Sequence, residues 1–228
     1  MDTIRGKFFK QHLLSDQFLD LIEKNKRPMD ELMSYYQCAI MEVETKLNVL
    51  NEQFSLQYDR NPISSIQTRL KRMDSISEKL AKDDLPMTLQ SMEENLNDIA
   101  GVRVICSFPE DVYMIADALL SQDDITLISK KDYIREPKTN GYRSLHLIVT
   151  VPIFLADEKR LMKVEIQLRT IAMDSWASLE HQLRYKKEFE FTDQMADELY
   201  RCAQISAELD ARMDNLRSIV HGNIKNKR

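Results

Sequence analysis

The sequence predicts an α+β fold, a mixed β-sheet flanked by helices, with helical extensions at both ends. Two observations carry this prediction. The outer thirds of the chain place apolar residues at alternating steps of three and four, which is the spacing of one helix face. The middle contains runs that alternate or are rich in β-branched residues, at 102–108, 125–129, 145–151 and 163–168, with helical stretches before and between them.

The two helical ends share one apolar pattern. The first seam contains Met33, Tyr36, Ile40, Val43, Leu47, Leu50 and Phe54, and the second contains Met195, Leu199, Cys202, Ser206, Leu209, Met213, Leu216 and Val220. Pro28 and Pro62 stand where chain-breaking residues would begin and follow the first helix. We favour the interpretation that the two helices pack on each other, and the alternative is that they form an interface between subunits.

The composition is typical of one folded unit. The chain has 228 residues, 43% of them hydrophobic, with only 4 glycines and no Pro- or Ser-rich linker, so we expect a single domain over 1–228. Within it we expect N-terminal helices at 1–60, a catalytic core at 62–186 and a C-terminal helix at 190–220. A net charge of −5 excludes a general attraction to nucleic acid or to anionic membranes.

Cysteine use and hydropathy indicate the compartment. Cys38, Cys106 and Cys202 are far apart and form no CxxC pair, which is typical of reduced thiols and disfavours a structural zinc site. No run approaches the roughly 20 apolar residues that a membrane span needs, and the N-terminus lacks the apolar core of a signal peptide. We therefore expect a cytoplasmic protein.

The segment from Thr68 to Lys79 carries a candidate phosphate-binding ladder. Read as a helix, it places Lys71, Ser75 and Lys79 one above another on one face. Two ammonium groups and a hydroxyl in a row suit an extended triphosphate, because each can contact a different phosphate. A solvated lysine face has the same spacing, and this segment alone favours that simpler interpretation.

A second segment leads directly into the first predicted strand. Asp98 and Arg103 would flank the start of that strand, and Gly101 between them would let the backbone turn tightly. The carboxylate and the guanidinium are candidates for a binding site, but a structural salt bridge explains the pair equally well.

The segment from Lys138 to His146 combines a loop with chemically active side chains. Its first four residues, Lys-Thr-Asn-Gly, predict a hairpin turn, and a tyrosine, an arginine, a serine and a histidine follow within five residues. Tyr142, beside such a loop, is placed to stack on a nucleotide base. A surface hairpin with a half-buried Tyr142 is the competing interpretation.

The strand expected at 163–168 alternates cleanly. Its apolar residues would face the core, and Glu165, Gln167 and Arg169 would share the opposite side. The next segment is too apolar to be fully exposed, so we expect Glu165 inside a cleft, where a carboxylate can hold Mg²⁺ or accept a proton. The sequence contains neither GxxxxGK[ST] nor GxGxxG, so side chains would have to hold any nucleotide.

Taken in series, these four segments resemble the synthetase domain of the RelA/SpoT family. The matching residues read RLKxxxSxxxK from Arg69, DxAGxR from Asp98, NGYRSxH from Asn140 and EIQLRT from Glu165. The chain is most similar to the small alarmone synthetases of this family. The resemblance implies a fold related to nucleotidyltransferases and transfer of the β,γ-pyrophosphate of ATP to the 3′-hydroxyl of GDP or GTP. That reaction releases AMP and makes ppGpp or pppGpp, and we expect synthesis without hydrolysis.

The resemblance also assigns roles to the matching positions. For ATP, Arg69 and Arg103 would sandwich the adenine, while Lys71, Ser75 and Lys79 would bind the phosphates. Asp98 and Glu165 would coordinate Mg²⁺, and Glu165 also lies where the family's proposed general base acts. For GDP or GTP, Tyr142 would stack on guanine, Lys131, Lys138 and His146 would meet the 5′ phosphates, and Gln167 and Arg169 would support the same face.

Two positions depart from the family pattern. Asp174 stands where relatives often have an asparagine near the guanine nucleotide, so the detailed contacts of that nucleotide are expected to differ. Ser65 stands where the RelQ-like branch has a phenylalanine implicated in binding an activating alarmone. We therefore expect a RelP-like protein with weak or absent alarmone activation. Both branches form homotetramers, in which the apolar seams would serve as subunit interfaces.

Three other functions stay open at this point. A catalytically silent nucleotide-binding regulator is disfavoured because Asp98 and Glu165 are both present. A nucleotidyltransferase that moves NMP is disfavoured by the NGYRSxH segment, and it would release pyrophosphate rather than AMP. RNA binding is secondary, because the chain is acidic and lacks a basic stripe interleaved with aromatic residues.

Overall fold

The computed structural model describes residues 26–58, 60–185 and 191–225. Its centre is a five-stranded sheet in the order β1-β2-β5-β4-β3. The strands are β1 (Ile63–Leu70), β2 (Ala100–Cys106), β3 (Thr126–Asp132), β4 (Leu145–Phe154) and β5 (Lys159–Thr170). β2 and β5 run parallel, whereas the other neighbouring pairs are antiparallel. The predicted mixed sheet is confirmed.

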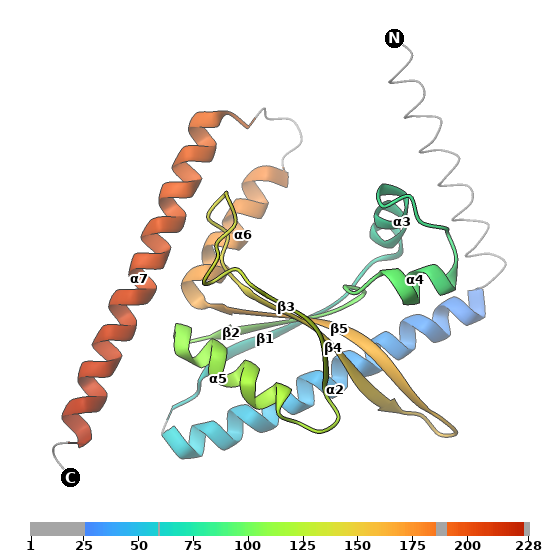
Figure 1. Ribbon diagram of the computed structural model, residues 1–228, viewed down its shortest axis with the longest axis horizontal. Helices are drawn as coiled ribbons and strands as arrows, with labels where there is room; N and C mark the ends of the chain where they lie inside the picture. The colour runs from blue at the N-terminus through green and yellow to red at the C-terminus, as the bar shows by residue number, and fades with distance from the viewer. Residues whose placement is uncertain (1–25, 59, 186–190, 226–228) are drawn as a thin grey trace.

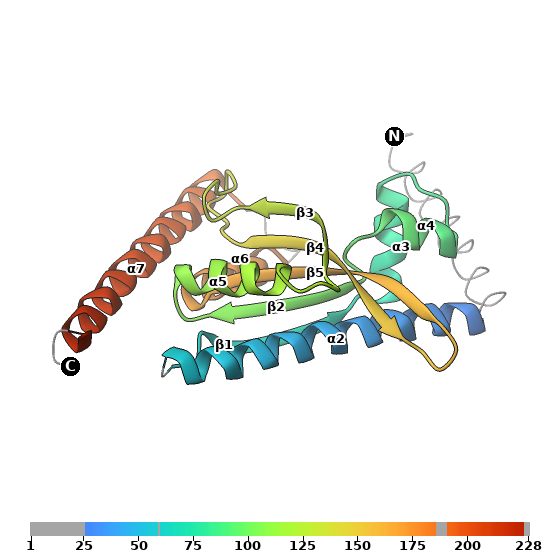
Figure 2. The same ribbon diagram turned by 60° about the horizontal axis from the view of Figure 1, so that its bottom comes forward.

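Helices surround this sheet unevenly. They are α2 (Lys26–Tyr58), α3 (Met73–Lys82), α4 (Leu89–Asn95), α5 (Pro109–Leu120), α6 (Ile171–Tyr185) and α7 (Asp193–Lys225). Figure 1 shows α3 and α4 at one end of the sheet and α6 and α7 at the other. Figure 2 shows α2 running beneath the strands. The part of the predicted N-terminal helices that falls on residues 1–25 lies outside the described residues.

The seam of α2 packs on the sheet. Tyr36, Ile40 and Val43 are buried, and α2 contacts β1, β2, β4 and β5. Val104 of β2 and Ile166 of β5 belong to the same core. The favoured interpretation, in which the two helical seams pack on each other, is therefore wrong. A helix that covers a sheet needs one apolar face as much as a helix that packs on another helix, so the spacing could not distinguish them.

The predicted ladder of Lys71, Ser75 and Lys79 is wrong in its first member. The chain stays extended in β1 through Leu70, and α3 begins only at Met73. Lys71 thus precedes the helix, while the other two residues lie on it. The segment changes from strand to helix within three residues, and a single helical reading of the pattern misses that change.

β1 is absent from the predicted strands for a local reason. A bulge between Ile63 and Ser65 interrupts its pairing with β2. Its apolar residues Ile63, Ile66 and Leu70 consequently follow at steps of three and four, which is the spacing of a helix rather than the alternation of a strand. As an edge strand, β1 is paired on one side only, to β2.

α7 is packed quite differently from α2. It contacts α6 and α5, yet much of its apolar seam is exposed, including Leu209, Met213, Leu216 and Val220. A row of exposed apolar residues along one helix is typical of an interaction surface. The interpretation of this seam as a subunit interface therefore fits α7, although it does not fit α2.

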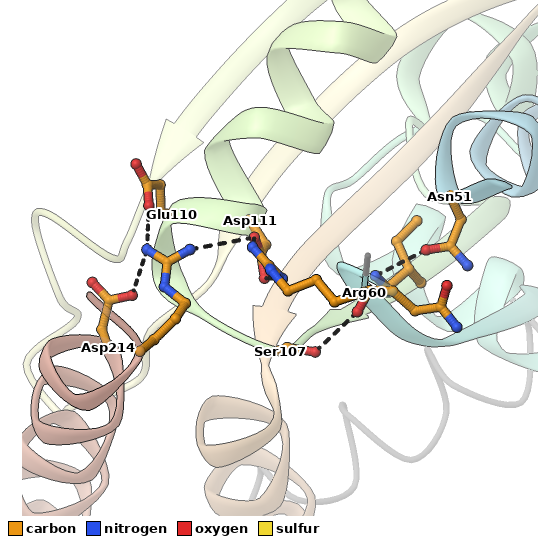
Figure 3. A network of polar contacts seen from close by, with 9 residues as sticks. Asn51, Arg60, Ser107, Glu110, Asp111 and Asp214 are labelled. Carbon is orange, nitrogen blue, oxygen red and sulfur yellow. Dashed lines mark hydrogen bonds and ion pairs between the residues drawn. The ribbon is translucent and has the colours of Figure 1, made fainter. Parts of the chain in front are cut away.

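A polar network fastens the C-terminal half of α7 to α5 (Figure 3). Arg217 of α7 forms ion pairs with Glu110 and, at 2.9 Å, with Asp214. Its Nη1 also lies 3.9 Å from Asp111, which is 1% exposed and accepts hydrogen bonds from Arg60 at 2.7 and 2.5 Å. Because a buried carboxylate needs such partners, this network fixes one end of α7 to the core.

Candidate active site

One row of polar side chains crosses all five strands on the face opposite α2. In register from edge to edge, the row contains Gln67, Arg103, Gln167, His146 and Lys131. Residues paired in register lie on the same face of a sheet and close to one another. Five separate segments of the sequence therefore meet on one surface, and four of the five residues were predicted for the site.

A cleft of about 220 Å³ lies over this surface. Arg69, Asp98, Gly101 and Glu165 help to line it. Gly101 is part of β2 and has no positive φ, so the predicted tight turn at this residue is wrong. It pairs with Arg69 on one side and with Glu165 on the other. Because it has no side chain, it leaves the floor of the cleft open between these two charged groups.

Asp98 lies between two lysines. Lys71 Nζ donates to its Oδ2 at 2.7 Å, and Lys79 Nζ lies 2.8 Å from its Oδ1. Burial alone would raise the pKa of Asp98, but the hydrogen bonds and positive charges of the two lysines outweigh burial and hold that pKa below its usual value. Asp98 is therefore ionised at neutral pH. The loop that carries it brings the two ends of the predicted lysine ladder to one carboxylate.

Glu165 is the second carboxylate of the cleft. Gln167 Nε2 donates to its Oε2 at 3.1 Å, and His146 Nδ1 lies 3.5 Å from its Oε1. Burial would raise the pKa of Glu165, but the contacts with His146 and Gln167 outweigh both burial and the nearby charge of Asp98, so the pKa is lowered. Glu165 is thus a carboxylate at neutral pH, able to bind a cation or to accept a proton.

Arg103 and Arg169 share one carboxylate. Asp174 Oδ1 lies 3.2 Å from Arg169 Nη1 and 3.5 Å from Arg103 Nη1. Burial lowers the pKa of Arg103, and the charge of Arg169 adds to this effect. The Nε atoms of both arginines are buried without a hydrogen-bond partner in the described part of the chain. Asp174 therefore bridges the two arginines, and Arg169 also donates through Nη2 to Tyr142 and Gln167.

Tyr142 is the centre of an aromatic cluster at the other end of the row. Its hydroxyl lies 2.8 Å from His146 Nε2 and accepts a hydrogen bond from Arg169 Nη2 at 2.6 Å. Tyr133 stands edge-on to Tyr142 and His146, with ring centres 6.1 and 5.3 Å apart. Lys138 Nζ lies 4.7 and 5.0 Å from the ring centres of the two tyrosines. Aromatic faces beside positive charges suit a nucleotide base and its phosphates.

The loop that carries Tyr142 is shaped by Gly141. Gly141 N donates to Lys138 O at 2.8 Å and closes the predicted turn, which lies within the longer loop between β3 and β4. Gly141 has a φ of 87°, and a Cβ there would lie 2.5 Å from the Cβ of Ala203 in α7, so a side chain does not fit. Tyr142 is half-buried against Trp176 and Ala203, as the competing interpretation of this segment expected.

Two predicted residues lie at the margin of the site. Ser75 is on α3, with its Oγ 3.4 Å from Asp74, and Lys131 is exposed on β3. Neither is among the residues that line the cleft. Their assigned contacts with phosphates stay predictions.

Three residues of the site were not predicted. Gln67 belongs to the polar row, and Tyr133 to the aromatic cluster. Lys163 donates to the carbonyl oxygens of Glu93 and Glu94 at 2.9 and 2.7 Å, and so holds the last turn of α4, just before the loop that leads to β2. The alternation of β5 could have found Lys163, which lies two residues before a cleft carboxylate. Nothing local in the sequence distinguishes Tyr133.

The model of a region found in RelA and SpoT proteins matches residues 68–190, more than half of the chain. This chain belongs to the RelA/SpoT family. The RelA/SpoT-family protein is 42% identical to the GTP pyrophosphokinase YwaC of Bacillus subtilis strain 168, over 78% of this chain and 85% of that protein. It is 34% identical to the GTP pyrophosphokinase YjbM of the same strain, over 81% of this chain and 86% of that protein.

Solved structures agree with this assignment. Small alarmone synthetase 1 from Bacillus subtilis, bound to its product pppGpp, matches with a TM-score of 0.77 at 32% identity, over 85% of this chain and 98% of that chain. Small alarmone synthetase 2 from the same organism matches with a TM-score of 0.75 at 38% identity, over 83% and 98% of the two chains. The resemblance to the small alarmone synthetases and the α+β fold are confirmed. The assignment to the RelP-like branch stays a prediction.

Proposed function

We propose that this RelA/SpoT-family protein is a GTP pyrophosphokinase that transfers the β,γ-pyrophosphate of ATP to the 3′-hydroxyl of GDP or GTP and releases AMP. One observation carries the proposal. A single surface joins two ionised carboxylates, Asp98 and Glu165, to a cationic region on β1 and β2 and to an aromatic region around Tyr142. Similar proteins are GTP pyrophosphokinases, which supports the same reaction here.

ATP would bind on the side of β1 and β2. Arg69 and Arg103 project from these adjacent strands, and planar guanidinium groups stack well on an adenine ring. Lys71 and Lys79, which form ion pairs with Asp98, would exchange that carboxylate for phosphate oxygens. Ser75, in the first turn of α3, would add a hydroxyl group.

The guanine nucleotide would bind on the side of β3 and β4. Tyr142 would stack on the base, and the cluster around it would supply further aromatic edges. Lys131, Lys138 and His146 would meet the 5′ phosphates. Gln167 would orient Glu165, to which it donates a hydrogen bond, and Arg169 would orient Tyr142 in the same way.

The two carboxylates Asp98 and Glu165 would together hold a divalent cation. Asp98 and Glu165 line one cleft, and both pKa values are lowered, so both groups are ionised. Within the described residues, no group of three His, Cys, Asp or Glu forms a complete metal site. Mg²⁺ usually takes one or two carboxylates together with phosphate and water oxygens, which this pair allows. When bound, Mg²⁺ would neutralise charge on the phosphates of ATP.

The reaction requires an aligned hydroxyl and an acceptor for its proton. The 3′-oxygen forms a bond to the β-phosphorus of ATP as the bond from that phosphorus to the bridging oxygen of AMP breaks. Glu165 would accept the hydroxyl proton, with His146 and Gln167 holding its carboxylate in place. Holding both nucleotides in line contributes much of the rate, because effective molarities are worth roughly 7–11 kcal/mol in favourable cases.

Transfer of label from ATP tests this function. The purified protein would be incubated with ATP labelled on its γ-phosphate, Mg²⁺ and GDP or GTP, and the nucleotides would be separated by chromatography. We expect the label in a more highly phosphorylated guanine nucleotide, together with an equal amount of AMP. Release of free pyrophosphate would instead identify a nucleotidyltransferase. Binding of both nucleotides without transfer would identify a silent regulator.

We also propose that the protein assembles as a homotetramer. The exposed seam of α7 continues into an apolar groove of about 680 Å³ between α6 and α7, lined by Trp176, Leu179, Leu209 and Met213 among others. Apolar surface of this kind is costly in water and is normally covered by a partner. Light scattering after size-exclusion chromatography tests the assembly, and Met213→Glu should shift it toward smaller species.

A cytoplasmic location is the corresponding proposal for the compartment. Cys38, Cys106 and Cys202 are all free thiols, which is typical of a reducing environment. Among the helices that the structure describes, none has the length and apolar character to cross a membrane. Fractionation of the source cells would test the location.

A further inference from the structure

The C-terminal helix holds the loop that carries Tyr142. On one side of Tyr142, Gly141 lies against Tyr200 and Ala203 of α7. On the other side, Arg143 Nη1 donates a hydrogen bond to Asp210 Oδ2 of α7 at 3.2 Å. The segment is therefore attached to α7 both before and after the aromatic ring.

Asp210 is the polar centre of this attachment. Its side chain is buried, and Oδ2 also accepts a hydrogen bond from Thr170 Oγ1 at 2.9 Å. Thr170 ends β5, and its Oγ1 accepts a hydrogen bond from Met173 N in the first turn of α6 at 3.1 Å. One carboxylate thus joins α7 to the loop, to the end of β5 and to the start of α6. The residue before Thr170 is Arg169, which donates to the Tyr142 hydroxyl.

A buried carboxylate at this place is costly for stability. Burial raises the pKa of Asp210 in spite of its hydrogen bonds with Thr170 and Arg143. Apolar residues of similar volume often replace a buried ion pair without loss of stability. A hydrogen-bonded charge pair nevertheless has a direction that apolar contacts lack, and here it fixes the backbone next to Tyr142.

We propose that Asp210 is a positioning residue for the acceptor nucleotide. Through its contact with Arg143, Asp210 fixes the position of the Tyr142 ring. This inference rests on the proposed pyrophosphokinase function and on Tyr142 as the contact to guanine. It makes α7 a part of the guanine side of the site, although α7 does not line the cleft between Asp98 and Glu165.

The variant Asp210→Asn keeps the shape of the side chain and removes its charge. We expect the KM for GDP to rise about tenfold, the factor that corresponds to weakening one charge-assisted hydrogen bond, with the KM for ATP unchanged. Binding of GDP can also be followed without catalysis. Trp176 is the one tryptophan of the chain and packs beside Tyr142, so its fluorescence reports on this region. The Kd for GDP should rise by the same factor.

Two further variants separate positioning from general loosening of α7. Arg217→Met removes a second polar attachment of α7, to Glu110 and Asp111, and should leave both KM values unchanged. Arg143→Gln should raise the KM for GDP as much as Asp210→Asn does. The double variant of Arg143 and Asp210 should be no worse than either single variant, because the two residues act through one contact.

The outcomes are distinct. An unchanged affinity for GDP in Asp210→Asn would overturn the proposal, and so would an equal rise in both KM values or the same effect in Arg217→Met. If Asp210→Asn does not fold, titration of Arg143→Gln with GDP answers the same question. Failure of the proposed function would look different: the unmodified protein would bind GDP and transfer nothing, and the fluorescence titrations would still test Asp210.

Discussion

The proposed ATP side and the proposed guanine side of the site are supported in different ways. On the ATP side, Asp98 is paired directly with Lys71 and Lys79, and the supporting elements β1, α3, α4 and β2 follow one another in the chain. On the guanine side, Tyr142 lies on a loop that α7 holds from a distant part of the sequence. On the proposed assignment, we expect changes in α7 to alter acceptor binding and to leave the ATP side intact.

The largest effect is expected where the two sides meet. Glu165→Gln removes the charge that would hold the cation and accept the proton, so kcat should fall by about a thousandfold or more while the protein stays folded. Asp98→Asn should abolish transfer in the same way. Label transfer from ATP measures the loss, and Glu158→Gln, an exposed carboxylate just before β5, is the matched control. Near-normal turnover in Glu165→Gln would show that the site is assigned wrongly.

The next effect belongs to the guanine side alone. Tyr142→Ala removes the stacking ring, which is worth about 1–3 kcal/mol per base, so the KM for GDP should rise roughly 5- to 150-fold. The KM for ATP should change little. Initial rates at varied concentrations of each nucleotide measure both constants. A loss shared equally by both nucleotides would contradict the separation of the two sides.

A smaller effect is expected on the ATP side. Lys163→Met removes two hydrogen bonds to the last turn of α4 and should lower the free energy of unfolding by about 1–2 kcal/mol. The KM for ATP should rise severalfold, and binding of GDP should stay the same, which is the mirror image of Asp210→Asn. Thermal unfolding and initial rates test this, with Lys130→Met on β3 as the control for loss of an exposed lysine. If GDP binding weakened as well, the two sides would not be independent.

The smallest effect is an opposite response of the two sides to acid. The lowered pKa of Asp98 means that its ionised form stabilises the fold above its usual pKa, and this stability is lost as the pH falls through the folded pKa. The raised pKa of Asp210 means that its ionised form costs stability, and this cost is relieved as the pH falls through the folded pKa.

Melting temperatures measured from pH 7 down to about pH 3, a range that crosses the usual pKa of aspartate, test this difference. The protein should be free of Mg²⁺ and nucleotide, so that ligand binding does not contribute to the change in melting temperature. Asp98→Asn should lose less stability on acidification than the unmodified protein, and Asp210→Asn should lose more. Shifts of the same sign in the two variants would contradict the assignment.

Local sequence patterns predicted most of the strands and most of the residues that meet on one surface. The alternation at 163–168 identified β5 and the face of Glu165, because the period of a strand is a local property. The four motifs named residues that the structure brings onto one surface. The same local reasoning misplaced Lys71 on a helix and missed β1, where a bulge gives apolar residues a helical spacing.

Tertiary structure alone decided which partners these residues have. The two apolar seams look alike in the sequence, yet α2 covers the sheet and α7 exposes its seam. The burial of each seam depends on whether another segment of the chain presents an apolar surface to it. The hydrogen bond from Lys71 to Asp98 likewise joins residues that are 27 positions apart, and the hydrogen bond from Arg143 to Asp210 joins residues that are 67 positions apart. Local patterns specify which face a side chain occupies, but only long-range packing specifies what it meets there.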